Sequence, residues 1–262
     1  MNDEKKREIG VSVVIPTYNR PDYLIRILQS ICNQTRKVEE VIIVNDHSQN
    51  LSEYNMVIDE FRDKIDMKYI VNEKNMGAPY CRNIGIQESK YCYIALTDDD
   101  DEWMADKIEK QFERMQSGSY GLLYTYGIAV DKDNKEICRF EEQETNLRSL
   151  LKKNFIPSSS VMVSYDAISK AGMFDIRMPS CQDWDMWIRI IASGFAFQGI
   201  EEPLIVYHKH DRASIGTGIK VKEGYKLYYK KHLKKYIKFF LLSNDYRVAL
   251  YAIKMATQHR KT

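Results

Sequence analysis

Long apolar runs, paired cysteines and an apolar leader are all missing from this chain of 262 residues. No window holds the roughly 18 apolar residues that a membrane-spanning helix requires. The start, MNDEKKREIG, has no apolar segment of the kind found in secretory signals. The five cysteines are widely spaced and include no CxxC pair, which argues against a disulfide framework or a zinc site. We therefore expect reduced thiols and a cytoplasmic location.

Two glycine motifs for phosphate binding are also missing. No GxGxxG segment follows a predicted strand, which argues against dinucleotide binding, and no Walker loop is present. Acidic residues become scarce at the end of the chain. Residues 220–262 hold twelve Lys or Arg and two acidic residues, so the rest of the chain carries a net charge of −8. This asymmetry predicts an anionic partner for the C-terminal segment.

Apolar runs alternate with helical segments in the first hundred residues. The β-branched run 11–15 is typical of a strand buried on both faces. This alternation predicts an α/β domain with a mostly parallel sheet and crossover helices. The segments PTYN, NDHS and TDDDD would then meet at one sheet edge, where such folds bind nucleotides. Strands are predicted at 11–15, 41–44, 67–72 and 91–97, and helices at about 22–32, 52–65 and from 77.

The second half continues without a linker or repeat. A turn at 131–134 predicts a hairpin, and FAFQGI and LIVYH predict a strand pair at 195–200 and 204–208. We expect one domain over residues 1–218, with a nucleotide-binding half at about 10–103 and an acceptor-binding half at about 104–218, followed by a helical extension at 219–262. Helices are predicted at 147–153, 166–172, 183–194, 225–241 and 246–257.

Four consecutive aspartates, Asp98 to Asp101, follow the apolar strand at 91–97. Like charges in a row are tolerated best at a strand end open to water, or where a cation holds them. The simpler interpretation is a solvated loop, with Asp101 capping a helix predicted in MADKIEKQF. The position after a buried strand favours a metal and phosphate site instead.

Six segments in order and register carry a family resemblance. They are VSVVIPTYNR, VIIVNDHS, NMGAPYCRNIGI, YIALTDDDDEWM, GMFD and QDWDMWIRI. Over about residues 10–215 the chain resembles the family-two inverting glycosyltransferases of GT-A fold, which have a single Rossmann-like domain. The resemblance implies an enzyme that moves a sugar from a nucleoside diphosphate to an acceptor hydroxyl.

The resemblance implies a nucleotide site at the ends of the first two strands, usually for uridine. Pro16, Thr17 and Tyr18 would line the base, and Asp46 would accept the imino proton of uracil. Arg82 would be the cation beside it, because uracil offers one donor between two acceptors. The alternative for Asp46 is an ordinary turn at a strand end.

The aspartate run corresponds to the DxD motif of the family. Asp98 would then meet the ribose with Asp99 beside it, and Asp100 would hold Mn²⁺ or Mg²⁺, although a shift of one position along the run is open. Oxygen ligands and a diphosphate suit a hard cation. His210 matches a histidine that completes the metal site in some members, and a purely structural histidine is the alternative.

Asp183 corresponds to the catalytic base of the family. Gln182 stands before it, where the family usually has glutamate. The alternative is that Asp183 only caps the helix that it begins. We expect the acceptor to bind near Ser159 and Trp184.

The QxxRW motif of processive synthases is missing, so transfer of one sugar per encounter is expected. The predicted function is inverting, metal-dependent transfer of a single sugar from a UDP-sugar to a glycan or lipid-linked acceptor in cell-surface polysaccharide biosynthesis. We expect no nucleic acid partner. A nucleotidyltransferase making nucleotide sugars and a non-catalytic nucleotide-binding module are the alternatives. The C-terminal segment is a basic amphipathic helix. It would bind an anionic surface on the inner face of the membrane, or else dock on the domain or on a second copy.

Overall fold

The computed structural model describes residues 7–141, 146–209, 219–241 and 243–257. Within these residues the strands form one nine-stranded sheet in the order β3-β2-β1-β4-β8-β6-β9-β5, with β7 paired to β6. The strands are β1 (Glu8–Thr17), β2 (Glu40–Asn45), β3 (Met67–Val71), β4 (Tyr91–Leu96), β5 (Asp101–Trp103), β6 (Tyr120–Val130), β7 (Glu136–Phe140), β8 (Met162–Ser164) and β9 (Ala196–His208).

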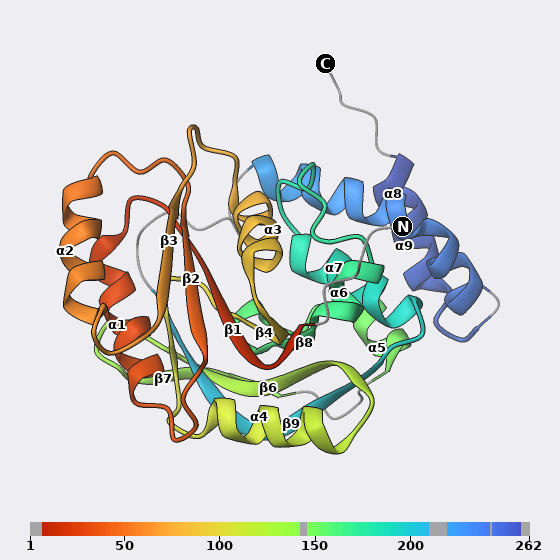
Figure 1. Ribbon diagram of the computed structural model, residues 1–262. Coiled ribbons are helices and arrows are strands. Elements are labelled where there is room, and N and C mark those ends of the chain that lie inside the picture. The colour runs from red at the N-terminus through yellow and green to blue at the C-terminus, as the bar shows by residue number, and fades with distance from the viewer. Residues whose placement is uncertain (1–6, 142–145, 210–218, 242, 258–262) are drawn as a thin grey trace, which may run out of the picture.

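The helices cover both faces of the sheet (Figure 1). The buried side chains of α1 and α2 pack with one face of β1 and β2, whereas α3 contacts the opposite face. The helices are α1 (Pro21–Cys32), α2 (Leu51–Phe61), α3 (Ala78–Glu88), α4 (Lys107–Ser117), α5 (Leu147–Lys152), α6 (Tyr165–Lys170), α7 (Gln182–Ala192), α8 (Ile219–Phe240) and α9 (Tyr246–Thr257), with a 3₁₀ turn η1 (Ser158–Ser160).

The parallel strands β3, β2, β1 and β4 explain why the polar segments meet. Thr17 at the end of β1 pairs in register with Asn45 at the end of β2, and Val14 pairs with Leu96 near the end of β4. The carboxyl ends of these strands therefore share one edge, as predicted. Residues 11–17 of β1 are buried on both faces, also as predicted from the β-branched run.

The strand pair predicted for the second half and the helix cap considered for Asp101 were both wrong. Residues 196–208 form the single strand β9. It pairs in parallel with β6 on both sides of Pro203, and the pairing only shifts register near this proline. Asp101 does not cap a helix, because it lies in β5, which pairs with β9, and α4 begins only at Lys107.

The C-terminal helices α8 and α9 pack against each other and against the second half of the domain. Tyr228, Tyr236, Phe240, Ala249 and Ala252 are buried in one apolar cluster with residues of α5, α6 and α7. Figure 1 shows the two helices beyond α7, on the side of the molecule far from α1 and α2. The apolar face of the extension therefore docks on the domain. No helix in the described part of the chain is both long enough and apolar enough to cross a membrane.

Candidate active site

The end of β1 is tied directly to the aspartate run. The Thr17 hydroxyl, 3% exposed as a residue, donates a 2.7 Å hydrogen bond to Oδ2 of Asp99 and lies 2.8 Å from the hydroxyl of Tyr54. Pro16 before it is buried, and Tyr18 after it is 45% exposed. Of the three residues predicted to line the base, Tyr18 is therefore the one that presents its side chain to solvent.

Asp46 follows β2 and is already engaged by the loop that leads into α3. Its Oδ1 accepts hydrogen bonds from the backbone N–H of Met76 at 2.8 Å and from Asn72 Nδ2 at 2.9 Å. Its Oδ2 accepts from the backbone N–H of Gly77 at 2.7 Å. The Cys81 thiol is a further hydrogen-bonding neighbour of this carboxylate, which offers about four acceptor positions. Gly77 has φ 86°, which explains the glycine here, because left-handed backbone strains other residues.

Two arginines face the aspartate run from different helices. Arg20, just before α1, places Nη1 2.7 Å from Oδ2 of Asp100 and 3.4 Å from Oδ1 of Asp99. Arg82 on α3 places Nη2 2.5 Å from Oδ1 of Asp98. Asp98 has the more open side chain, 40% exposed against 13% for Asp100. The run is thus held at a charged edge, with Asp98 facing solvent.

The two remaining aspartates are buried, and their charges are costly. Burial, together with the charge of Asp100, raises the pKa of Asp99 to about 7, although hydrogen bonding to Thr17 opposes the shift. Burial and the charges of Asp100 and Asp98 raise the pKa of Asp101 well above its ordinary value. Oδ1 of Asp101 is buried without a hydrogen-bond partner. Ionisation of these two carboxyl groups is therefore disfavoured unless a cation offsets their charge.

The carboxylates of the aspartate run could supply some, but not all, of the ligands of a hard divalent cation. The available ligands are carboxylate oxygens, which Mg²⁺ and Mn²⁺ prefer. Among the described residues, no group of three or more His, Cys, Asp or Glu side chains is arranged to hold a metal by itself. Mg²⁺ in nucleotide sites commonly uses one or two carboxylates together with substrate phosphates. A cation that arrives with such a phosphate would favour the ionised form of the buried carboxyl groups.

Asp183 lies in the first turn of α7. Its Oδ1 accepts a 2.8 Å hydrogen bond from the backbone N–H of Trp184, and its Oδ2 accepts one of 2.9 Å from Asn154. The first bond gives a partner to one of the backbone N–H groups in the first turn of α7, which have none within the helix. Burial also raises the pKa of Asp183, while its hydrogen bonds and the charge of Arg82 pull the pKa the other way. A raised pKa is a property that a general base needs at neutral pH.

Arg82 lies between the aspartate run and α7. It pairs with Asp98, and its charge also lowers the pKa of Asp183, whereas the charge of Asp98 raises it. Side chains from α3, from the end of β4 and from α7 therefore share one electrostatic environment. Arg82 is 4% exposed, and its Nε and Nη1 are buried without hydrogen-bond partners.

The residues predicted to contact the acceptor are both enclosed. Trp184 is 5% exposed, donates to the carbonyl of Leu150 at 2.6 Å, and stacks on Tyr228 with ring centroids 4.0 Å apart. Ser159 is 1% exposed and accepts a 3.0 Å hydrogen bond from the backbone N–H of Asp98. Its hydroxyl donates to Asp101. In the structure Trp184 packs in the core and Ser159 fixes the start of the aspartate run. The predicted metal ligand His210 lies outside the described residues.

Sequence reasoning missed three polar residues of this region. Arg20 follows PTYN directly, so its place before a helix at the sheet edge was a usable signal. Tyr54, which contacts Thr17, is a buried residue of α2, and Asn154, which contacts Asp183, stands in a loop after α5. Neither has a local pattern that distinguishes it from core or turn residues.

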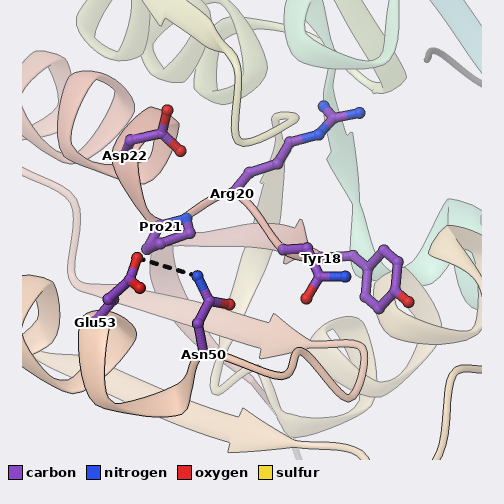
Figure 2. A pocket seen from close by; sticks show the side chains of 7 residues that line it. Tyr18, Arg20, Pro21, Asp22, Asn50 and Glu53 are labelled. Carbon is purple, nitrogen blue, oxygen red and sulfur yellow. Dashed lines mark hydrogen bonds between the residues drawn. The ribbon is translucent and has the colours of Figure 1, made fainter. Parts of the chain in front are cut away.

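A cavity of about 440 Å³ borders the site on the side of α1 and α2. Its lining residues are Tyr18, Asn19, Arg20, Pro21, Asp22, Asn50 and Glu53. Figure 2 shows the side chains of Tyr18 and Arg20 extending away from Asn50 and Glu53, which are joined by a hydrogen bond of 3.1 Å. None of the four residues Asp98 to Asp101 lines this cavity. It therefore lies beside the aspartate run and does not contain it.

Comparisons with known proteins agree with this architecture. Residues 12–171 match the family model described as Glycosyl transferase family 2. TuaG of Bacillus subtilis, provisionally named as a teichuronic acid biosynthesis glycosyltransferase, is 31% identical over 204 residues, which cover 75% of this chain and 78% of TuaG.

Two solved structures are similar in fold. TarS of S. aureus in complex with UDP-GlcNAc has a TM-score of 0.75 at 14% identity, over 94% of this chain and 72% of that chain. The mannosyltransferase PcManGT of Pyrobaculum calidifontis in complex with GDP-Man and Mn²⁺ has a TM-score of 0.67 at 14% identity, over 97% and 79%. These likenesses confirm the predicted GT-A fold.

Proposed function

The chain belongs to glycosyl transferase family 2, and from this membership we propose that it is an inverting, metal-dependent enzyme that transfers one sugar from a UDP-sugar to an acceptor hydroxyl. The family makes it a glycosyltransferase, so nucleotidyl transfer and a purely binding role are set aside. One observation carries the proposal: Arg82 pairs with Asp98 and acts electrostatically on Asp183, so the aspartate run and the candidate base belong to one site.

Asp183 is the general base of the proposed reaction. Its carboxylate takes the proton of the acceptor hydroxyl as that oxygen forms a bond to the anomeric carbon, on the face opposite the diphosphate. The bond from the anomeric carbon to the diphosphate oxygen breaks, and the nucleoside diphosphate leaves with the electron pair. One displacement inverts the configuration. Assistance by a general base typically contributes about 10²- to 10⁴-fold.

The aspartate run and Arg20 bind the nucleoside diphosphate that leaves. Asp98 meets the ribose, with Asp99 beside it, and Asp100 holds the divalent ion. Mn²⁺ or Mg²⁺ bound with the donor supplies positive charge against the negative charge that develops on the departing diphosphate. Arg20, which contacts Asp100, keeps this carboxylate oriented. The raised pKa values of Asp99 and Asp101 support a cation there, because a nearby positive charge would favour their ionised forms.

Uridine is proposed as the base because of Asp46. A carboxylate suits the single imino donor of uracil, which would replace one of the present partners of Asp46. The two similar structures were solved with UDP-GlcNAc and with GDP-Man, so the fold accommodates both kinds of donor. Titration of the protein with UDP and GDP by calorimetry separates them. Tighter binding of GDP would contradict the uridine assignment.

The acceptor is proposed to be a glycan or a lipid-linked glycan of cell-surface polysaccharide biosynthesis. The relative TuaG, named for teichuronic acid biosynthesis, supports this class. Release of UDP from a panel of UDP-sugars, with and without Mn²⁺ and with lipid-linked acceptors, tests the whole proposal. Absence of transfer from every UDP-sugar in the presence of metal would overturn it.

The exposed face of α8 is proposed to bind an anionic membrane surface on the cytoplasmic side. Its apolar face is docked on the domain, and the outer face between residues 227 and 241 interleaves aliphatic residues with lysines and has no acidic residue. Each lysine close to anionic lipid contributes about 1 kcal/mol. The exposed residues of this face are Leu227, Lys230, Lys234, Ile237, Lys238 and Leu241.

Sedimentation with liposomes tests the membrane contact. Binding to vesicles containing anionic phosphatidylglycerol, but not to neutral phosphatidylcholine vesicles, is expected, and binding should weaken as salt is raised. Lys230→Glu together with Lys234→Glu should abolish it. Absent or salt-insensitive binding contradicts this part of the proposal, and dimer formation in light scattering would assign the face to self-association.

A further inference from the structure

The residues that surround the candidate base contact α8 at several successive positions. Asp183 itself is held by Asn154 and by the helix start, but its neighbours in the segment 180–185 reach outward to the C-terminal helix. The contacts of this segment involve the backbone, an aromatic stack and ion pairs. They are different in kind.

The first contact lies before the base. The Ser180 hydroxyl donates a 3.3 Å hydrogen bond to the carbonyl of Val221. Gly224 lies directly against Ser180, because a Cβ at this glycine would be 2.8 Å from the backbone nitrogen of Ser180. The next residue, Cys181, has φ 57°, a left-handed conformation that a residue with a side chain adopts only when its surroundings hold it. The turn into α7 is therefore strained and is braced by α8.

The second contact immediately follows the base. The Trp184 ring stacks on Tyr228 with an interplanar angle of 21°. Stacked aromatic pairs restrict both partners beyond the effect of area burial alone. Because Trp184 is the next residue after Asp183, its ring fixes the direction in which the first turn of α7 points.

The third contact is a buried charge cluster at Asp185. His232 Nε2 lies 2.9 Å from Oδ1 of Asp185, and Lys231 Nζ lies 2.9 Å from Oδ2. Arg189 of the same helix also donates to Oδ2. Burial would raise the pKa of Asp185, but His232, Arg189 and Lys231 together lower it to about 2. Asp185 is fully buried, so removal of one partner leaves a charge without compensation.

The contacting residues of α8 form one stripe. Positions 221, 224, 228, 231 and 232 are three, four or one apart, which is the spacing of residues on one face of a helix. We infer that α8 is a positioning element of the active site, which holds the 180–185 segment through this stripe and so sets the place of the Asp183 carboxylate. The inference rests on the proposed role of Asp183 as the base.

Gly224→Ala gives the sharpest test. The added methyl group displaces the 180–185 segment, and a misplacement of about 1 Å in a catalytic group can cost about 10²-fold in rate. We expect kcat to fall about 10²-fold, while UDP binding, measured by calorimetry, stays within twofold of wild type, because the nucleotide residues lie at the ends of β1, β2 and β4 and on α3. Loss of kcat and UDP binding together would overturn the inference, since α8 would then merely support the fold.

A second set of variants remains informative if Gly224→Ala does not fold. His232→Leu removes the hydrogen bond to Asp185, and His232→Gln can keep a donor near the position of Nε2. Lys231→Met removes one charge, with the exposed Lys222→Met of the same helix as the matched control. We expect lower kcat for His232→Leu and Lys231→Met, recovery in His232→Gln, and no change in Lys222→Met.

The pH profile of kcat supplies a further reading. Arg82, Asp98 and Asn154 face Asp183, and burial raises its pKa. A displaced and better hydrated carboxylate has a lower pKa, so the acidic limb should move to lower pH in Gly224→Ala and His232→Leu. Unchanged kcat and an unchanged acidic limb in both would refute the role of α8. If Asp183→Asn retains transfer, the proposed base fails instead, whatever these variants do.

Discussion

Nη2 of Arg82 lies 2.5 Å from Oδ1 of Asp98, although the two residues come from a helix and from the end of a strand. The guanidinium is almost fully buried, and its other nitrogens have no hydrogen-bond partner. A buried charge with only one such contact is costly in an interior of low polarity. Arg82 is therefore more than a fold element. Its charge acts on Asp98, the proposed ribose contact, and on Asp183, the proposed base.

Arg82→Met should move the pH dependence of transfer. The charge of Arg82 lowers the pKa of Asp183, so its loss lets that pKa rise further. A base that is protonated at higher pH shifts the acidic limb of the kcat profile to higher pH. Rates measured between pH 5 and 9 check this, with the exposed Arg62→Met as the control. An unchanged acidic limb in Arg82→Met would mean that the charge of Arg82 does not influence the base.

Asp183→Asn should lower kcat by about 10²- to 10⁴-fold with the fold intact. Asparagine can keep an acceptor for the Trp184 N–H, but it cannot take a proton from the acceptor hydroxyl. Product formation, thermal unfolding and UDP binding should be measured together. Asp166→Asn on the exposed side of α6 is the matched control. Turnover near that of wild type would leave Asp183 with only its role at the helix start.

Asp46→Ala should weaken UDP binding and also destabilise the protein. The alanine leaves the N–H groups of Met76 and Gly77 and the amide of Asn72 without their acceptor. Each buried polar group left unsatisfied costs about 1–3 kcal/mol. Calorimetry with UDP and GDP and denaturant unfolding report the two effects, with the exposed Asp63→Ala as control. Retained preference for UDP over GDP would contradict the role of Asp46 in base recognition.

The sheet edge was predictable because parallel strands have a strong local signal. The β-branched run of β1 and the polar residues that end β1, β2 and β4 determine a shared edge whatever the details of packing. The second half was harder. β9 reads as two strands because Pro203 interrupts the apolar pattern, and its continuity depends on the partner strand β6. Long-range pairing of this kind leaves no local trace.

The candidate site shows the same division. Asp46 and the aspartate run were found because each ends a strand, whereas the role of Asn154 depends on a loop brought near α7 by folding. Trp184 was misleading because an aromatic residue beside a candidate base suits an acceptor pocket and a core equally well. Only its enclosure by Tyr228 and Leu150 distinguishes the two.

Trp184 therefore gives a prediction on stability. Trp184→Ala should lower the free energy of unfolding by about 3–5 kcal/mol, because a large buried ring is lost from the contact with α8. Trp184→Phe should restore much of that stability. If the ring serves only packing, the phenylalanine variant keeps the wild-type KM for the acceptor. A clear rise of that KM at unchanged stability would return Trp184 to the acceptor site.

The charge of the aspartate run predicts how pH and metal act together. The folded-state pKa of Asp99, about 7, exceeds its ordinary value of 3.8, so the folded protein holds a proton that the unfolded chain has already lost between these values. The contribution of Asp99 to stability therefore falls as pH rises from about 4 to 7. Above pH 7 the carboxylate is charged, and a bound cation relieves the repulsion.

Thermal unfolding with Mg²⁺ and UDP at pH 6 and pH 8 checks this sign. The increase in Tm caused by the metal should be larger at pH 8, because at pH 6 the metal competes with the proton on Asp99. Asp99→Asn removes the titrating group, so its Tm without metal should depend less on pH over this range. Asp100→Ala should lose the response to metal and keep only the part of the pH dependence of Asp99 that burial causes, because the charge of Asp100 also raises that pKa. An equal metal effect at both pH values in the wild-type protein would mean that the cation binds without influence on this buried carboxylate.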